Sequence, residues 1–153
     1  MSFLLSIDEN DLSQLIPFID RYEQLITDIE PYFDLNGKRL EAQCKDLPHF
    51  MSRYDQSYQE LKSLEEWLVS KRDKVAARLW KKYTEGYSRA LTSKDIQMYI
   101  AGEKDFAAFT EFILEIGNLK GKFQSIVKAL EQMGWMLSHI TKLRVAEMQD
   151  AIL

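Results

Sequence analysis

The chain has 153 residues, of which 46% are hydrophobic and 29% are charged, and its formal net charge is −4. These values fit one folded domain with a buried core and exclude the disordered and fibrous classes of protein. The apolar runs are far shorter than the ~20 residues of a bilayer span, so the sequence predicts no transmembrane helix.

The N-terminus and the cysteine content predict a cytoplasmic protein. Met1 to Ile7 are apolar, but they lack a basic region and a cleavage pattern and are followed by acidic residues, so we expect no signal peptide. The single cysteine, Cys44, excludes an internal disulfide and is typical of a reducing compartment. Because Cys44 has no obvious base partner, we expect a small buried residue rather than a nucleophile.

The first expected helix covers residues 8–30. Strand-like alternation is absent over any useful length of the sequence, and β-branched residues are sparse. Asp8 can cap this helix, Pro17 must kink or split it, and Pro31 limits its end. Its apolar stripe consists of Leu12, Leu15, Ile16, Ile19, Tyr22 and Ile26.

The second expected helix is long and runs from Pro48 to about Tyr83, with Gly86 as its stop. A turn at Asn36-Gly37 and a short helix near residues 39–45 are expected before it. Its apolar positions fall within an arc of roughly 60° if each residue turns the helix by about 100°. They are Leu61, Leu64, Leu68, Val75 and Leu79.

A short helix and a final long helix complete the chain. Thr92 and Asp95 form a Thr-x-x-Asp pattern in which the threonine can cap a short helix ending at Gly102. Beyond it, apolar residues recur at alternating steps of three and four, which predicts the seam of a coiled coil or bundle. The seam residues are Phe109, Phe112, Ile116, Leu119, Phe123, Ile126, Leu130, Met133, Leu137 and Ile140.

The predicted fold class is all-α, an elongated antiparallel hairpin of two long helices with additional short helices. Gly117 and Gly121 lie off the seam and could permit a close helix contact, whereas Gly134 is interpreted as a residue that loosens the helix. One hairpin leaves apolar stripes uncovered, so we expect self-association.

Positive charge is concentrated between Lys71 and Lys94, where eight basic and two acidic residues give a net charge of +6. Five of these cations form one side of the helix, here called the basic stripe: Lys71, Lys74, Arg78, Lys81 and Lys82. Such a ladder can follow a phosphate backbone without reading bases. Trp67 lies one turn before Lys71 and could stack on a base, whereas Trp80 points away and is assigned to packing or a protein partner.

Other interpretations of the basic stripe stay open. It could be a solvated helix face that pairs with the acidic N-terminal segment, or the surface with which a helical scaffold or adaptor binds an acidic protein. Membrane-surface binding is a further alternative, but aromatic residues do not collect on the apolar face, which argues against a membrane partner.

Residue sets typical of enzymes are absent from the sequence. His49 and His139 have no Cys, Asp or Glu set at metal-ligand spacing, so each is interpreted as an ordinary core or surface histidine. Gly117 and Gly121 stand within a helical pattern and form no phosphate-binding loop. We therefore expect no enzyme, no cofactor and no metal site.

Short motifs follow one another in a characteristic order along residues 38–150. They are Leu40-Glu41-Ala42, Lys74 to Leu79, Tyr83 to Gly86, Leu91-Thr92-Ser93, Ala101 to Asp105, Ala129-Leu130, Gly134-Trp135, Ser138-His139-Ile140, Leu143-Arg144 and Glu147. In order and spacing they resemble the UvsY recombination mediator proteins of T-even-type phages, over about three quarters of the chain.

The resemblance implies a small helical protein that assembles into a ring-like homo-oligomer, a hexamer or heptamer. It implies a role in phage DNA recombination, repair and replication, in the host cytoplasm. Such mediators bind single-stranded DNA, help displace the phage single-strand-binding protein, and load the RecA-like phage recombinase. Residues 33–153 would then form the DNA-binding and oligomerisation domain, and residues 1–32 an acidic helical extension whose role is open.

The resemblance also points to particular DNA contacts. The family uses a lysine and an arginine two residues apart on the basic helix, and Arg78 matches the arginine. Ala76 stands at the lysine position, so Lys74, Lys81 and Lys82 would have to compensate.

Overall fold

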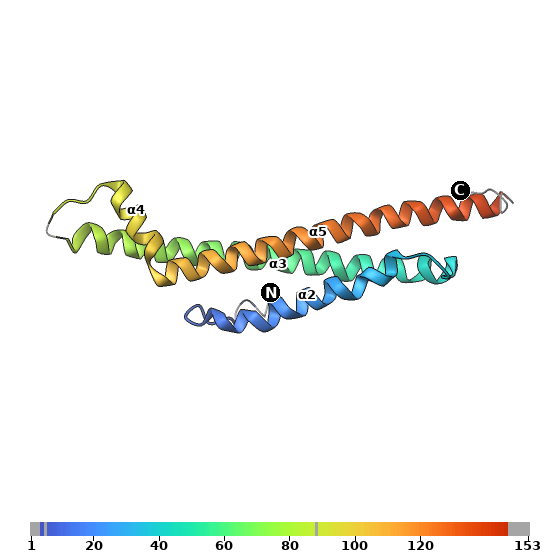
Figure 1. Cartoon of the computed structure of the whole chain (residues 1–153), viewed down its shortest axis with the longest axis horizontal. Helices are drawn as coiled ribbons and strands as arrows, with labels where there is room; N and C mark the ends of the chain where they lie inside the picture. The colour runs from blue at the N-terminus through green and yellow to red at the C-terminus, as the bar shows by residue number, and fades with distance from the viewer. Residues whose placement is uncertain (1–3, 5, 88, 147–153) are drawn as a thin grey trace.

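The computed structural model describes residues 4, 6–87 and 89–146, which lie in helices and the turns that join them (Figure 1). No strand occurs within this part of the chain, so the all-α prediction is confirmed. None of its helices is both long and apolar enough to cross a membrane. The elements are η1 (Leu12–Leu15), α2 (Ile16–Ile29), η2 (Glu30–Phe33), α3 (Leu40–Glu85), α4 (Ser93–Gly102) and α5 (Lys104–Val145).

Prolines divide the N-terminal segment. Pro17 stands in the first turn of α2, where its missing N–H has no helical partner to lose, and it separates α2 from η1 as predicted. Pro31 likewise opens η2 just beyond the end of α2. The predicted cap at Asp8 is wrong, because the Asp11 carboxylate accepts a hydrogen bond from the Ser13 backbone N–H at 3.2 Å and caps η1.

Helix α3 continues for 46 residues, so the predicted start at Pro48 is wrong. Pro48 lies inside α3, and the short helix expected near residues 39–45 is its first turns. A proline here removes the hydrogen bond to the Cys44 carbonyl. Cys44 is exposed, contrary to its predicted burial, so water can satisfy that carbonyl. The predicted stop is confirmed, because α3 ends with Gly86 as its C-cap.

The predicted antiparallel hairpin is confirmed, since α3 and α5 lie side by side in opposite directions along the molecule (Figure 1). Seven of the ten seam residues of α5 are buried and the other three are half-buried. Helix α2 closes the same core, because its Tyr22 ring packs edge-on against Phe123 at 5.7 Å while Tyr54 of α3 stacks on Phe123 at 5.7 Å.

A second, smaller core joins α4 to the end of α3. Leu79 and Tyr83 of α3 are buried there against Ile96 and Ile100 of α4. The predicted cap of α4 is confirmed as a full capping box, because Thr92 accepts from the Asp95 N–H and Asp95 accepts from the Thr92 N–H. Helix α4 is therefore placed beside the last turns of the basic helix.

The glycines of α5 differ in their surroundings. A Cβ at Gly117 would meet Glu65 Oε2 of α3 at 2.8 Å, so the predicted close contact is confirmed there, whereas Gly121 has nothing within 4 Å. At Gly134 a Cβ would lie 3.1 Å from Leu47 Cδ2, so this glycine makes room for a packed leucine and does not merely loosen the helix.

Gly121→Ala is expected to stabilise the protein by about 0.5–1 kcal/mol, because alanine restricts the unfolded chain and fits the open site. Gly117→Ala should gain less, since the new methyl group displaces the Glu65 carboxylate from its 2.7 Å contact with Lys120. Urea unfolding of both variants measures the difference. A gain at Gly117 equal to that at Gly121 would contradict the close contact.

Candidate nucleic-acid interface

The basic stripe occupies the last third of α3 and is about 16 Å long, given a rise of about 1.5 Å per residue. Lys74, Arg78, Lys81 and Lys82 are exposed, and Lys71 is half-buried. Four of the five predicted cations are therefore exposed on α3, and their role in DNA binding stays a prediction. Arg72, which the stripe omits, turns toward α5 and places its guanidinium 5.8 Å from the Phe106 ring centroid.

A groove runs along the stripe between the N-terminal segment, α3 and α5. Its lining includes Lys71, Lys74 and Arg78 of the stripe together with Lys104 at the start of α5. Lys104 was not predicted as a site residue, because it is separated from the stripe in sequence and only the hairpin brings it there. The groove thus gathers four cations from two helices, and the carboxylates of Glu9 and Asp105 also line it.

The near end of the stripe meets the acidic N-terminal segment. Lys71 Nζ lies 2.7 Å from Glu9 Oε2, and the resulting hydrogen bond and charge attraction lower the pKa of Glu9. The same ammonium lies 5.6 Å from the Trp67 ring centroid. Trp67 is half-buried and packs against the core, so one cation and the core both contact the residue nominated for base stacking.

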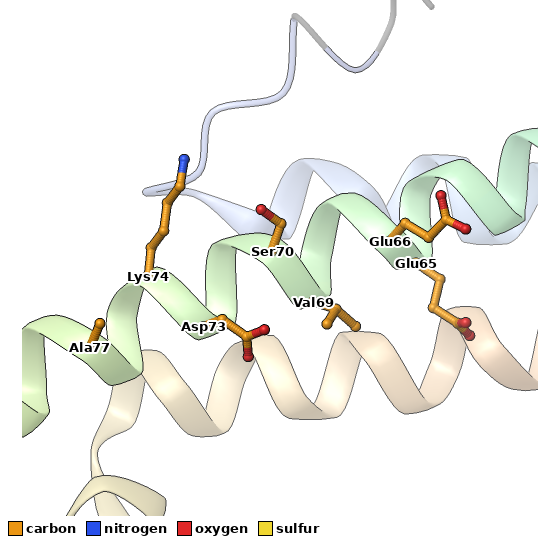
Figure 2. Close-up of a pocket in the computed structure, with 7 residues that line it drawn as sticks. All are labelled: Glu65, Glu66, Val69, Ser70, Asp73, Lys74 and Ala77. Carbon is orange, nitrogen blue, oxygen red and sulfur yellow. The ribbon is translucent and has the colours of Figure 1, made fainter.

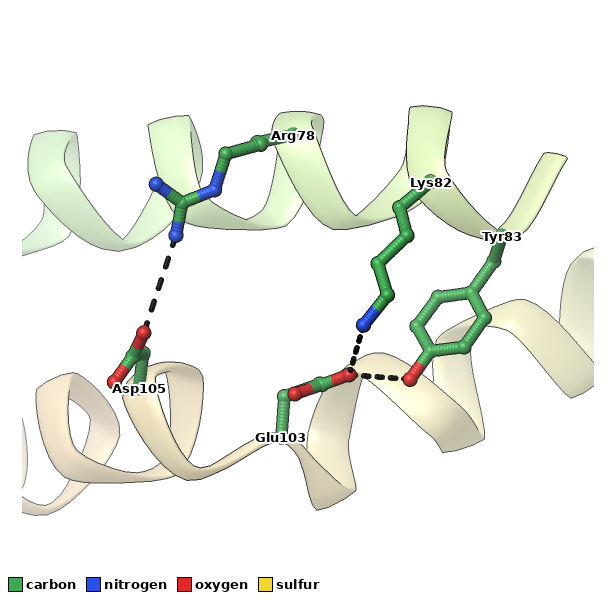
Figure 3. Close-up of polar contacts among 5 residues, drawn as sticks. All are labelled: Arg78, Lys82, Tyr83, Glu103 and Asp105. Atoms are coloured by element: carbon green, nitrogen blue, oxygen red, sulfur yellow. Dashed lines mark hydrogen bonds and ion pairs between the residues drawn. The ribbon is translucent and has the colours of Figure 1, made fainter. Parts of the chain in front are cut away.

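The far end of the stripe meets the junction between α4 and α5 (Figure 3). Arg78 Nη2 lies 4.0 Å from Asp105 Oδ2, and Lys82 Nζ lies 3.4 Å from Glu103 Oε1. The Tyr83 hydroxyl donates a hydrogen bond to the same Glu103 oxygen. This bond raises the pKa of Tyr83 to about 12, and it lowers the pKa of Glu103 together with the contact from Lys82.

The opposite flank of α3 carries the other sign of charge. A shallow hollow beside the stripe is lined by Glu65, Glu66 and Asp73, and Lys74 points away from Asp73 and Glu65 (Figure 2). The carboxylates disfavour a polyanion on that flank.

Among the described residues, no group of three or more His, Cys, Asp or Glu side chains could hold a metal ion. His49 and His139 are both exposed. Trp80, assigned to packing or a partner, is 39% exposed and lines an apolar hollow with residues of α4 that include Gln97 and Ala101.

Glu103→Gln is expected to lower the melting temperature at pH 7, and this effect should shrink as the pH falls below 4.5. The pKa of Glu103 is lowered in the folded state from its ordinary 4.5, so its ionised form stabilises the fold above that value. This contribution is lost as the pH falls through the lowered pKa. Thermal unfolding of both proteins across this range tests it, and a difference independent of pH would contradict the role of the charge.

Among solved structures, the fold is similar to that of the bacteriophage T4 recombination mediator protein UvsY. The TM-score is 0.69 and the sequence identity is 13%, with 82% of this chain and 98% of that chain covered. The chain therefore has a UvsY-type fold, which confirms at the level of the fold the resemblance found in the sequence motifs. No family model and no curated protein matches the sequence.

Proposed function

We propose that this protein is a non-catalytic recombination mediator that binds single-stranded DNA without sequence preference. In this role it helps load a RecA-like phage recombinase in place of the single-strand-binding protein. The observation that carries the proposal is the UvsY-type fold, which extends over nearly the whole length of the T4 mediator. The site of action would be the cytoplasm of the host.

The basic stripe supplies the chemistry for this proposal. Its cations hold carboxylates of the same chain at 2.7 Å (Lys71 with Glu9), 3.4 Å (Lys82 with Glu103) and 4.0 Å (Arg78 with Asp105). Ion pairs that water reaches in this way contribute little to stability, because solvent and salt screen them. Phosphates can replace the carboxylates at small cost, and the release of counterions from the DNA then favours binding.

Assembly into a hexameric or heptameric ring would multiply this weak contact. Each protomer offers four or five cations, and several protomers on one strand convert separate weak contacts into avidity. Large apolar side chains on the surface of α5 support self-association: Leu114 is 64%, Trp135 is 74% and Val145 is 80% exposed in the single chain. A mass measurement in solution tests the ring.

Salt dependence of binding to a labelled oligonucleotide tests the DNA proposal. Neutralising four or five phosphates of a single strand gives a slope of log K against log salt of about −2.8 to −3.5. Raising the salt from about 50 to 200 mM should thus weaken binding about 50- to 130-fold for each protomer engaged. Absence of binding at the lower salt, or binding indifferent to salt, would overturn the proposal.

A helical adaptor is the second candidate function. Three cations of the stripe already pair with carboxylates of this chain, which is the contact that an acidic protein would make. Trp80, on another side of α3, lines an apolar hollow that offers such a partner a second contact. This candidate predicts recovery of an acidic partner that the Arg78→Glu variant fails to capture, with no salt-sensitive DNA binding.

A further inference from the structure

Three tyrosine rings gather where the basic stripe ends. Tyr83 lies in the last turn of α3, Tyr87 follows just after the end of that helix, and Tyr99 belongs to α4. The Tyr99 ring stacks on Tyr83 with centroids 5.4 Å apart, and Tyr87 lies 5.6 Å from Tyr83. Tyr87 and Tyr99 lie 6.3 Å apart with their planes only 13° from parallel.

The cluster has a fixed base and an exposed top. Tyr83 is buried, its hydroxyl is bonded to Glu103, and the Lys82 ammonium lies 5.3 Å from its ring centroid. Tyr87 is 48% and Tyr99 46% exposed, so part of each ring is open to a ligand. The buried ring thus positions two exposed ones.

We propose that Tyr87 and Tyr99 form a stacking platform for the unpaired bases of a single strand of DNA whose phosphates lie on the basic stripe. The proposal rests on the proposed function and extends it from the phosphates to the bases. Aromatic platforms next to a cationic track are the usual means by which proteins bind single strands without reading sequence, because every base has a π-face.

Charge and position select this occupant. Lys82 immediately precedes Tyr83 on α3 and its ammonium lies against the Tyr83 ring, so a strand on the far end of the stripe would have the two exposed rings within reach. An acidic peptide would use the cations but gain little from two parallel rings. Trp67, nominated from the sequence, is half-buried beneath Lys71, so Tyr87 and Tyr99 are the better exposed aromatic surface.

The test compares two probes of equal length, oligothymidylate and an abasic deoxyribose-phosphate chain, by fluorescence anisotropy. The variants are Tyr87→Leu with Tyr99→Leu, which keep apolar bulk but remove the π-faces, and Tyr87→Phe with Tyr99→Phe as the matched control. Far-ultraviolet circular dichroism verifies that each variant retains its helices. Tyr83 is left unchanged because it is part of the small core.

We expect the leucine variant to lose about tenfold in affinity for oligothymidylate and less than about twofold for the abasic chain. The phenylalanine control should bind both probes within about twofold of the natural protein. Equal binding of the two probes by the natural protein, or an equal loss on both in the leucine variant, would overturn the platform and leave the phosphate contact standing. Binding of neither probe by the natural protein would overturn the proposed function and the platform together.

Photo-crosslinking gives a second readout that does not depend on the stability of a variant. A strand carrying 5-iodouracil joins to an aromatic side chain on which the base stacks. The natural protein should yield crosslinked peptides containing Tyr87 or Tyr99. Crosslinks confined to other residues would contradict the platform.

Discussion

Reversing two charges of the basic stripe, Arg78→Glu with Lys81→Glu, is expected to weaken binding of single-stranded DNA about 100-fold or more. The change removes two phosphate contacts and places two repulsive charges beside the strand. The slope of log K against log salt should become shallower by about 1.4, since each lost contact removes about 0.7. Anisotropy titrations at several salt concentrations measure both quantities.

The fold should tolerate this change, because both side chains are exposed and Arg78 contacts Asp105 only at 4.0 Å. Lys122→Glu with Lys128→Glu is the matched control, since these exposed lysines of α5 lie outside the stripe and alter the net charge equally. The control should lose no more than about threefold, from long-range charge alone. If the stripe variant binds single-stranded DNA as tightly as the natural protein does, the stripe is not the DNA-binding surface.

Replacing Phe123 by alanine is expected to lower the free energy of unfolding by about 3–5 kcal/mol. The Phe123 ring of α5 is fully buried and joins three helices, since Tyr22 of α2 and Tyr54 of α3 both pack against it. Its removal leaves a cavity that α-helical backbones on three sides cannot collapse to fill. Urea unfolding followed by circular dichroism measures the loss.

Met98→Ala serves as the surface control, because that side chain is 67% exposed on α4. It should change the free energy of unfolding by no more than about 0.5 kcal/mol. A loss of similar size for Phe123 and Met98 would show that Phe123 does not join the three helices as described.

The sequence predicted the features that arise from local chemistry. The spacing of the seam from Phe109 to Ile140 places these residues on one face only if the segment is helical. That face is the side of α5 that is buried in the core. Thr92 with Asp95 forms its capping box through groups three residues apart, and Gly86 ends α3 as expected. The stripe was predicted for the same reason, since helical geometry alone places its cations together.

Features that depend on tertiary neighbours could not be read in this way. A proline such as Pro48 often marks the start of a helix. Here α3 continues on both sides of it, because packing of the flanking Leu47 and Phe50 on the core stabilises the helix there. The lack of a side chain at Gly134 leaves room for Leu47, which is far away in sequence. Lys104 and Tyr99 reach the stripe only because the hairpin and α4 fold back beside α3.

Four buried side chains of the small core, Leu79, Tyr83, Ile96 and Ile100, hold α4 against the end of α3. An element held by few apolar contacts opens at a lower free energy than the rest of a fold, so α4 is expected to separate from α3 more easily than the two long helices separate from each other. Such an opening would part Tyr99 from Tyr83. It would also part Tyr99 from Tyr87, so a base that stacks on these two exposed rings together would contribute its binding free energy to the docking of α4. If the proposed platform binds bases, stacking on it and the docking of α4 would be one linked equilibrium.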